Sequence, residues 1–213
     1  TGLKDRYVCY PVEKFLIYMS AKNFAGKRIA DYPNIVAHFR PHKEELEQAK
    51  IKYGTPDKPY YFVHRERKEE FFAPGNEKIV SQIRCEHPRF FYTTDAFYGS
   101  RALFHIQTSR WNMRFLVGLL NSRIVEFWLE SRGKRQGKMF KLDKEPLLGI
   151  PIPLIDAAQQ KPVIALVDKI LAAKAKDAQA DTSELESQID TLVYDLYGLT
   201  EEEIAVVEGC HVD

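Results

Sequence analysis

The sequence predicts an α/β protein in which a mixed β-sheet with a packed central helix is followed by a helical hairpin. Three patterns support this: strand-like runs between residues 60 and 107, an amphipathic stretch at residues 111–131, and two amphipathic stretches after Pro162. With 213 residues, of which 45% are hydrophobic, the chain is long enough to bury a core. We expect one domain at residues 1–153 and a helical hairpin at residues 154–213.

The first predicted elements are helical. Within residues 33–50, Pro41 ends one short helix and begins a second, charged one. His38 and His42 lie four residues apart, but Pro41 keeps them from sharing a helical face, so no metal pair is predicted there. Residues 54–59, rich in Gly and Pro, are expected to form a loop.

Strands are predicted next, from runs of β-branched and aromatic residues. These runs lie at residues 60–66, 78–84, 89–94 and 102–107. The link at residues 95–101 contains Gly99 and Ser100, and we expect it to join the last two runs as a hairpin.

The clearest helix prediction covers residues 111–131, where apolar side chains recur at helical spacing and Ser109 can cap the start. We expect this helix to pack on the sheet. Residues 132–138 are basic and contain two glycines, which favours a flexible loop. The prolines in residues 147–153 indicate an edge strand or the exit from one.

The last part of the chain predicts two amphipathic helices joined by a short polar link at residues 177–182. Gly198 is expected to end the second helix, and Thr200 with Glu203 forms a capping-box pattern for a final short one. The apolar positions that define the two helices are Ile164, Val167 and Leu171, then Leu185, Ile189, Leu192 and Leu196.

Charge is divided unevenly along the chain. Residues 1–150 contain 27 Lys and Arg against 17 Asp and Glu, whereas residues 151–213 contain 4 against 13. A positive body is typical of a protein that binds phosphate, and an acidic tail avoids it. The alternative is that both parts are ordinary solvated surface.

Composition also narrows the setting of the protein. The sequence has neither an apolar run of membrane-spanning length nor a signal-peptide pattern, so we expect a cytoplasmic protein. Cys9, Cys85 and Cys210 are widely separated, which predicts neither a disulfide framework nor a zinc site. A chain that begins at Thr1 rather than Met indicates a piece of a longer protein.

One pattern points to an enzyme. Asp57, Glu66 and Lys68 resemble the Pro-Asp…Glu-x-Lys arrangement in which paired carboxylates hold a divalent ion that activates water. The alternative is a solvated or DNA-facing charge run. No nucleophile triad and no dinucleotide-binding glycine motif can be identified. We therefore expect no catalytic centre, no bound cofactor and no metal in this chain.

The basic segment at residues 132–138 is the strongest binding candidate. It is not a P-loop, because only three residues separate its glycines and Met139 stands where a Ser or Thr would reach Mg²⁺. Its cations suit phosphate contacts; Gln136 could read an adenine edge and Arg135 a guanine. The alternative is a solvated loop.

Several short runs occur together in a distinctive order. They are Tyr32-Pro33, Tyr60-Tyr-Phe-Val-His-Arg-Glu-Arg67, Lys78-Ile-Val80, Phe91-Tyr92, Leu119-Leu-Asn-Ser122 and Gly149-Ile-Pro-Ile-Pro153. Together they resemble the TaqI-like C-terminal specificity domain, the target recognition region of Eco57I-class restriction-modification enzymes and related adenine-N6 DNA methyltransferases. The tail at residues 192–204 is similar to the endings of these proteins and of type I specificity subunits.

This resemblance implies a division of labour. An upstream module of the same protein would bind S-adenosylmethionine and transfer the methyl group, with Mg²⁺ added if the parent enzyme also cuts DNA. The present chain would recognise double-stranded DNA in a prokaryotic cytoplasm, with no role at a membrane. The acidic hairpin would contact a protein neighbour or a second such domain through apolar packing.

The residues nominated for DNA contact share positive charge, an aromatic ring or a base-reading amide in the basic part of the chain. They are His64, Arg65, Arg67, Arg84, Tyr98, Arg101, Arg132, Lys134, Arg135, Gln136 and Lys138. Two alternatives stay open: a metal-dependent nuclease domain, and a protein-interaction module or type I specificity subunit fragment.

Overall fold

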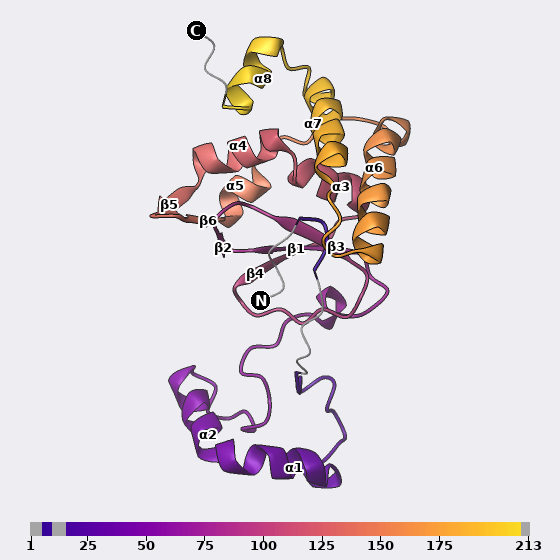
Figure 1. Cartoon of the computed structure of the whole chain (residues 1–213). Helices are drawn as coiled ribbons and strands as arrows, with labels where there is room; N and C mark the ends of the chain where they lie inside the picture. Colours follow the sequence, from indigo (N-terminus) through magenta and orange to yellow (C-terminus); the bar gives the residue numbers. More distant parts are fainter. Residues whose placement is uncertain (1–5, 10–15, 210–213) are drawn as a thin grey trace. The chain divides into compact units, whose positions relative to one another are not determined.

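The computed structural model describes residues 6–9 and 16–209, with only the backbone of Gln136. They form two compact units, one made of residues 6–9 with 70–209 and the other of residues 16–69 (Figure 1). Helices are mixed with small antiparallel sheets, which confirms the predicted α/β class.

The smaller unit is built from short helices. They are η1 (Ile29–Asp31), α1 (Pro33–Phe39), η2 (Arg40–His42) and α2 (Lys43–Lys52). Pro41 lies in the first turn of η2, which confirms the predicted break between α1 and α2. Pro41 has no N–H with which to continue the hydrogen bonding of α1, so the helix ends there.

The predicted strand at residues 60–66 is wrong, because these residues form turns and bends. Their aromatic rings pack against one another and against Phe24, with 5.1 Å between the ring centroids of Tyr61 and Phe62. The carbonyl of Phe62 accepts a hydrogen bond from the buried Lys50 ammonium at the end of α2. Turn bonds and a side chain therefore satisfy these backbone groups without a strand ladder, since the N–H of Phe62 donates to Pro59 and that of Val63 to Met19.

Within the described residues, the strands of the larger unit form two three-stranded antiparallel sheets with the orders β3-β1-β4 and β2-β6-β5. The first sheet consists of β1 (Lys78–Gln82), β3 (Phe90–Thr93) and β4 (Leu103–Ile106). The second consists of β2 (Arg84–Cys85), β5 (Lys134–Gln136) and β6 (Met139–Lys141).

The predicted hairpin between β3 and β4 is wrong, since β1 lies between them. Val80 in β1 is opposite Phe91 on one side and opposite His105 on the other. Val80 and its neighbour Ile79 are fully buried. The most buried strand therefore occupies the centre of the sheet, where both of its edges are hydrogen-bonded.

Ile83 joins the two sheets. Its N–H donates to the carbonyl of Ala102 at the start of β4 (2.9 Å), and its carbonyl accepts from the N–H of Leu142 just after β6 (2.8 Å). The chain therefore passes from β1 into β2 without leaving the sheet region. This continuity brings the start of β4 and the end of β6 to the same place.

The predicted central helix is interrupted, giving α3 (Met113–Leu120) and α4 (Arg123–Arg132). The break comes at Asn121, whose side chain accepts from the N–H of Phe90 (2.9 Å) and donates to its carbonyl (2.7 Å). Asn112, not Ser109, caps the start of α3. The side chain of Asn121 thus bonds to a distant strand at the point where the helix is interrupted.

The C-terminal helices follow the predicted pattern more closely. They are α5 (Lys144–Leu148), α6 (Ala157–Lys176), α7 (Ser183–Tyr197) and α8 (Glu201–Val207). The hairpin of α6 and α7 is confirmed, as is the left-handed Gly198 that ends α7 (φ 66°) and the capping box of Thr200 and Glu203. An edge strand at residues 147–153 is not formed, because α5 extends into this region.

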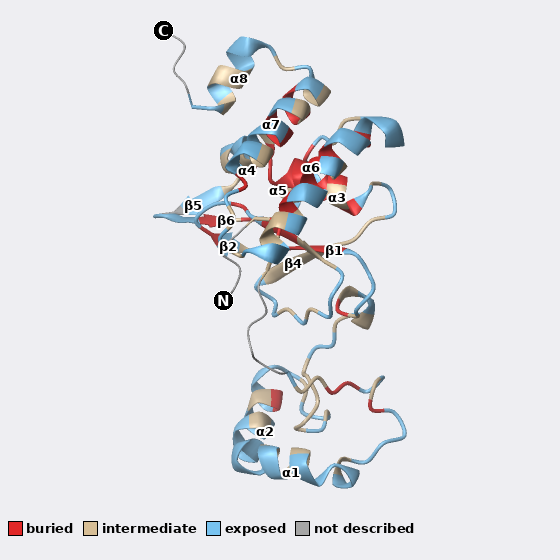
Figure 2. Ribbon diagram, turned by 45° about the vertical axis from the view of Figure 1, so that its right-hand side comes forward, coloured by how far each residue is buried: buried red, intermediate tan, exposed pale blue. Residues whose placement is uncertain are grey.

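The helical hairpin packs into the same compact unit as the two sheets. Gly118 of α3 faces Val163 and Val167 of α6, and both valines are buried. Figure 2 shows the buried residues of α3, α6 and α7 gathered on their facing sides. The apolar face expected to meet a protein neighbour is therefore covered by α3 of the same chain. Within the part of the chain that the structure describes, no helix combines the length and apolarity needed to cross a bilayer.

Candidate nucleic-acid interface

The basic segment after α4 forms a β-hairpin, so the predicted flexible loop is wrong. Gln136 and Met139 are the last paired residues of β5 and β6, and Gly137 between them has φ of 60°. A glycine with positive φ suits a two-residue turn between antiparallel strands. Gly133 also lies against the ring of the fully buried Phe140, where any larger residue would collide with it. These contacts hold the hairpin against α4.

Three cations form one row across the second sheet. Arg84 of β2 is opposite Lys141 of β6, which is opposite Lys134 of β5. Directly opposite residues lie on the same face, and like charges in these positions repel. In the neighbouring row, Cys85 and Phe140 are buried, so the cationic row occupies the other, outward face.

Further cations lie near this row. Arg135 is opposite the buried Phe140, so it lies on the other face of the hairpin. Lys141 pairs with Asp143 at 2.6 Å, Arg135 pairs with Glu130, and the guanidinium of Arg132 lies 4.0 Å from the centre of the Trp128 ring. Within residues 6–9 and 16–209, the exposed Arg84, Lys134 and Lys138 have no ion-pair partner. We call the cations on the hairpin and beside it the basic hairpin surface. They are Arg84, Arg132, Lys134, Arg135, Lys138 and Lys141.

Two further nominated residues lie in the link between β3 and β4. Arg101 is exposed and precedes Ala102, which bonds to Ile83, the residue before Arg84. Tyr98 stacks on the buried Phe72 with 5.1 Å between ring centroids. The link that carries both residues is therefore anchored close to the start of β2.

His64, Arg65 and Arg67 belong to the other compact unit. The ring of His64 stacks on Tyr53 with 4.7 Å between centroids, and Arg65 is exposed. The backbone N–H of Arg67 donates to the hydroxyl of Tyr18 at 3.1 Å. These residues shape a local turn in the smaller unit.

The nuclease pattern is not assembled as a metal site. The carboxylate of Glu66 accepts from the N–H of Ala21 (3.1 Å) and pairs with Lys58 (3.4 Å). In the described part of the chain, neither Asp57 nor Glu66 belongs to a group of three potential ligands. Glu66 therefore links two loop segments of the smaller unit through these contacts.

One such group does occur, made of His87, Glu126 and Glu130. Its carboxylates already have cationic partners. Glu126 lies 2.9 Å from the guanidinium of Arg6, and Glu130 pairs with Arg135. His87 lies 3.1 Å from Glu126 and 3.7 Å from Glu130. The group is an ion-pair network along α4.

Sequence reasoning missed Lys141 as a member of the basic hairpin surface. The signal was present, because a turn at Gly137 and Lys138 makes residues 134 and 141 opposite each other by counting outward from the turn. The flexible-loop interpretation hid it, since a register exists only between paired strands.

Comparison with known proteins agrees with this architecture. The model of the TaqI-like C-terminal specificity domain matches residues 8–152. The chain is also 25% identical over 146 residues to the type II methyltransferase M.HincII of Haemophilus influenzae, which covers 63% of this chain and 28% of that protein. The chain thus spans less than a third of this relative's length. The family match includes β1 to β6 and ends where the helical hairpin begins, and on this basis the chain belongs to the TaqI-like C-terminal specificity domain family.

Proposed function

We propose that this chain binds duplex DNA as the target recognition region of a restriction-modification enzyme. The family and the methyltransferase relative support a DNA-recognition role in such a system. The observation that supports the proposal most directly is the row of Arg84, Lys141 and Lys134, which places like charges side by side on an exposed face. Phosphate bound along this row would relieve their repulsion.

The shape of the basic hairpin surface suggests how it meets DNA. The tip of the hairpin, residues 136–139, lies beyond β2, which pairs only with Phe140 and Lys141 of β6. The major groove, about 12 Å wide, admits a two-stranded ribbon such as this tip. Lys138 lies at the turn, and Met139 beside it is 42% exposed. In this proposal the ribbon enters the major groove, its cations contact phosphates, and Gln136 and Arg135 reach base edges.

Catalysis belongs to the proposed upstream module. That module would bind S-adenosylmethionine and hold the adenine flipped out of the duplex, because a base inside the stack cannot be reached by a methyl donor. The present chain would set the position along the DNA at which this happens. Arg101, whose neighbour Ala102 bonds to Ile83, and Tyr98 in the same link are further proposed contacts.

The test is a salt series of duplex DNA binding by the 213-residue chain, measured by fluorescence anisotropy. The variant Lys134→Ala with Lys138→Ala removes two exposed cations that have no ion-pair partner among the described residues. The matched control, Lys161→Ala with Lys169→Ala, removes two exposed cations from α6. Each lost phosphate contact flattens the log–log salt slope by about 0.9, so the first variant should lose up to about 1.8.

The control should keep both the affinity and the slope of the unchanged chain. If the hairpin variant and the control bind DNA equally well at every salt concentration, the basic hairpin surface is not the DNA contact. If the unchanged chain binds no DNA, the proposed function itself is wrong.

A further inference from the structure

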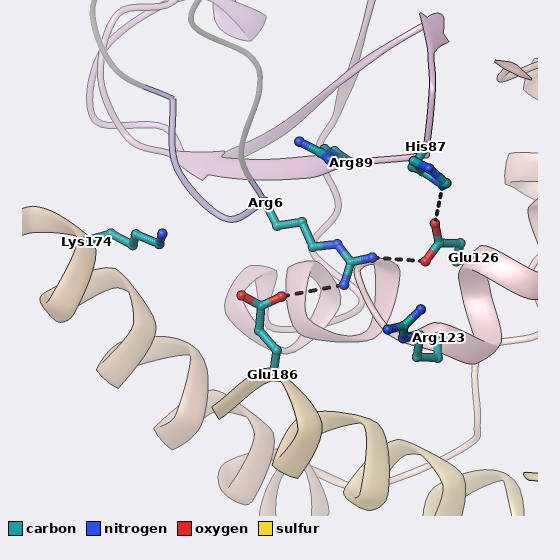
Figure 3. A pocket seen from close by; sticks show the side chains of 7 residues that line it. All are labelled: Arg6, His87, Arg89, Arg123, Glu126, Lys174 and Glu186. Carbon is teal, nitrogen blue, oxygen red and sulfur yellow. Dashed lines mark hydrogen bonds and ion pairs between the residues drawn. The ribbon is translucent and has the colours of Figure 1, made fainter. Parts of the chain in front are cut away.

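A second charged feature lies at the opposite end of α4 from the basic hairpin surface. It is a hollow of about 410 Å³ in the larger unit, and the described residues that line it all carry charged or titratable side chains (Figure 3). The lining residues are Arg6, His87, Arg89, Arg123, Glu126, Lys174 and Glu186. Since these described lining residues include no apolar side chain, the hollow suits a small charged ligand and not a hydrophobic one.

Both carboxylates of the hollow are already paired. Arg6 lies 2.9 Å from Glu126 and 3.5 Å from Glu186, and its position is held by Tyr7, whose backbone is hydrogen-bonded to β3. The guanidinium of Arg6 thus pairs with one carboxylate from α4 and one from α7. The other cations of the hollow retain their charge for an external anion.

Those cations come from three separate elements. Arg89 precedes β3, Arg123 begins α4, and Lys174 lies in the last turn of α6; within the described residues none of them has an ion-pair partner. In Figure 3 all three side chains lie around the Arg6 ion pairs. With His87 neutral, four cations and two carboxylates leave the lining with a net charge of +2.

One more carboxylate lies near the hollow without lining it. Asp190, buried in α7, accepts a hydrogen bond from the backbone N–H of Arg123 at 2.7 Å. This bond fixes the first residue of α4 while leaving its guanidinium exposed at the hollow. The backbone of Arg123 is therefore anchored at the hollow by a buried group of α7.

We propose that this hollow binds a phosphate group. Guanidinium groups bind phosphate oxygens through two parallel hydrogen bonds, and an ammonium adds a compact point charge. Two arginines and one lysine around a single site match that chemistry, whereas a metal cation would be repelled. The phosphate could be supplied by a DNA strand or by a free phosphate ion.

The DNA arm of this proposal rests on the proposed function. Arg123 and Arg132 are the first and last residues of α4, a ten-residue helix about 14 Å long. DNA phosphates on one strand are spaced about 3.4 Å along the axis, so roughly four steps separate the two ends of α4. One strand could therefore contact both the hollow and the basic hairpin surface.

The test uses a triple variant of the 213-residue chain, Arg89→Gln, Arg123→Gln and Lys174→Gln. The control, Lys161→Gln, Lys169→Gln and Lys176→Gln, removes the same number of positive charges from exposed positions of α6. Binding of inorganic phosphate is followed by amide NMR shifts, and binding of duplex DNA by anisotropy over a salt series. Tryptophan fluorescence on urea titration checks that the variant is folded.

The expected result is saturable phosphate shifts around His87, Arg123 and Lys174 that the triple variant loses and the control keeps. If DNA supplies the phosphate, the triple variant also loses about 0.9 of salt slope, the value for one phosphate, whereas the hairpin variant loses up to about 1.8. Phosphate shifts with unchanged DNA binding would identify a free phosphate ion as the ligand.

The two proposals fail separately. Phosphate shifts in a chain that binds no DNA would support the hollow and reject the proposed function. If the folded triple variant matches the control in both phosphate binding and DNA salt slope, the hollow is not a phosphate site.

Discussion

Asp190 should make the stability of the larger unit depend on pH in an unusual direction. It is buried in α7, and burial raises the pKa of its carboxyl from 3.8 to about 6, against the opposing effects of the Arg123 backbone N–H and the charges of Arg6 and Arg123. The unfolded chain therefore loses this proton first as the pH rises. Stability from this group falls between pH 3.8 and 6 and stays low above that range.

The size of the effect follows from the shift. About two pKa units correspond to roughly 3 kcal/mol of unfolding free energy. Asp190→Asn keeps a side-chain oxygen that can accept from Arg123 but has no charge to bury. Between pH 3.5 and pH 7, the unchanged chain should therefore lose about 3 kcal/mol of unfolding free energy relative to the variant.

Urea unfolding followed by tryptophan fluorescence measures this difference. The chain has two tryptophans, Trp111 and Trp128, and both lie in the same unit as Asp190. The control is Asp195→Asn, which removes one negative charge from an exposed position of α7. Parallel pH profiles for the Asp190 variant and the unchanged chain, or a difference of the opposite sign, would refute the reasoning.

Three further substitutions test the packing, each by urea unfolding with the same fluorescence signal. Gly118→Ala would place a methyl group 2.8 Å from Val163 Cγ1. Overpacking costs about 1–3 kcal/mol and helix propensity returns about 1 kcal/mol, so we expect a net loss of about 1–2 kcal/mol of unfolding free energy. A gain would contradict the close contact between α3 and α6. Asn121→Ala should cost about 1–3 kcal/mol, because the buried N–H of Phe90 loses its acceptor while the Phe90 carbonyl keeps the N–H of Tyr7 (3.0 Å); no loss would mean that α3 and α4 are not held to β3 in this way. Gly133→Ala should destabilise more than Gly137→Ala, since the first collides with Phe140 and lies 2.7 Å from the Leu129 carbonyl, while the second has open space and costs only about 1–2 kcal/mol of backbone strain; equal losses would count against the docking of the hairpin on α4.

Local patterns predicted the elements whose signals lie within a few residues of one another. The break at Pro41, the hairpin of α6 and α7, the left-handed Gly198 and the capping box of Thr200 were all predicted from spacing alone. The overall charge division was also readable, because it is a property of composition. The same is true of the cations at Lys134, Arg135 and Lys138, although not of their arrangement.

Contacts between distant segments decided the rest. Asn121 interrupts a strong helical pattern because it bonds to Phe90, which lies 31 residues earlier. β1 lies between β3 and β4, where Ile79 and Val80 are fully buried and both of its edges are hydrogen-bonded.

The candidate site divides in the same way. The sequence by itself determined that this part of the chain is basic, that it ends in a helical hairpin and that its motifs resemble a specificity domain. Only the tertiary structure decided that Arg84, Lys141 and Lys134 form one row and that Arg89, Arg123 and Lys174 surround one hollow. The physical reason is that residue spacing sets periodicity along a helix or strand, whereas strand order, register and helix packing depend on which distant surfaces bury each other.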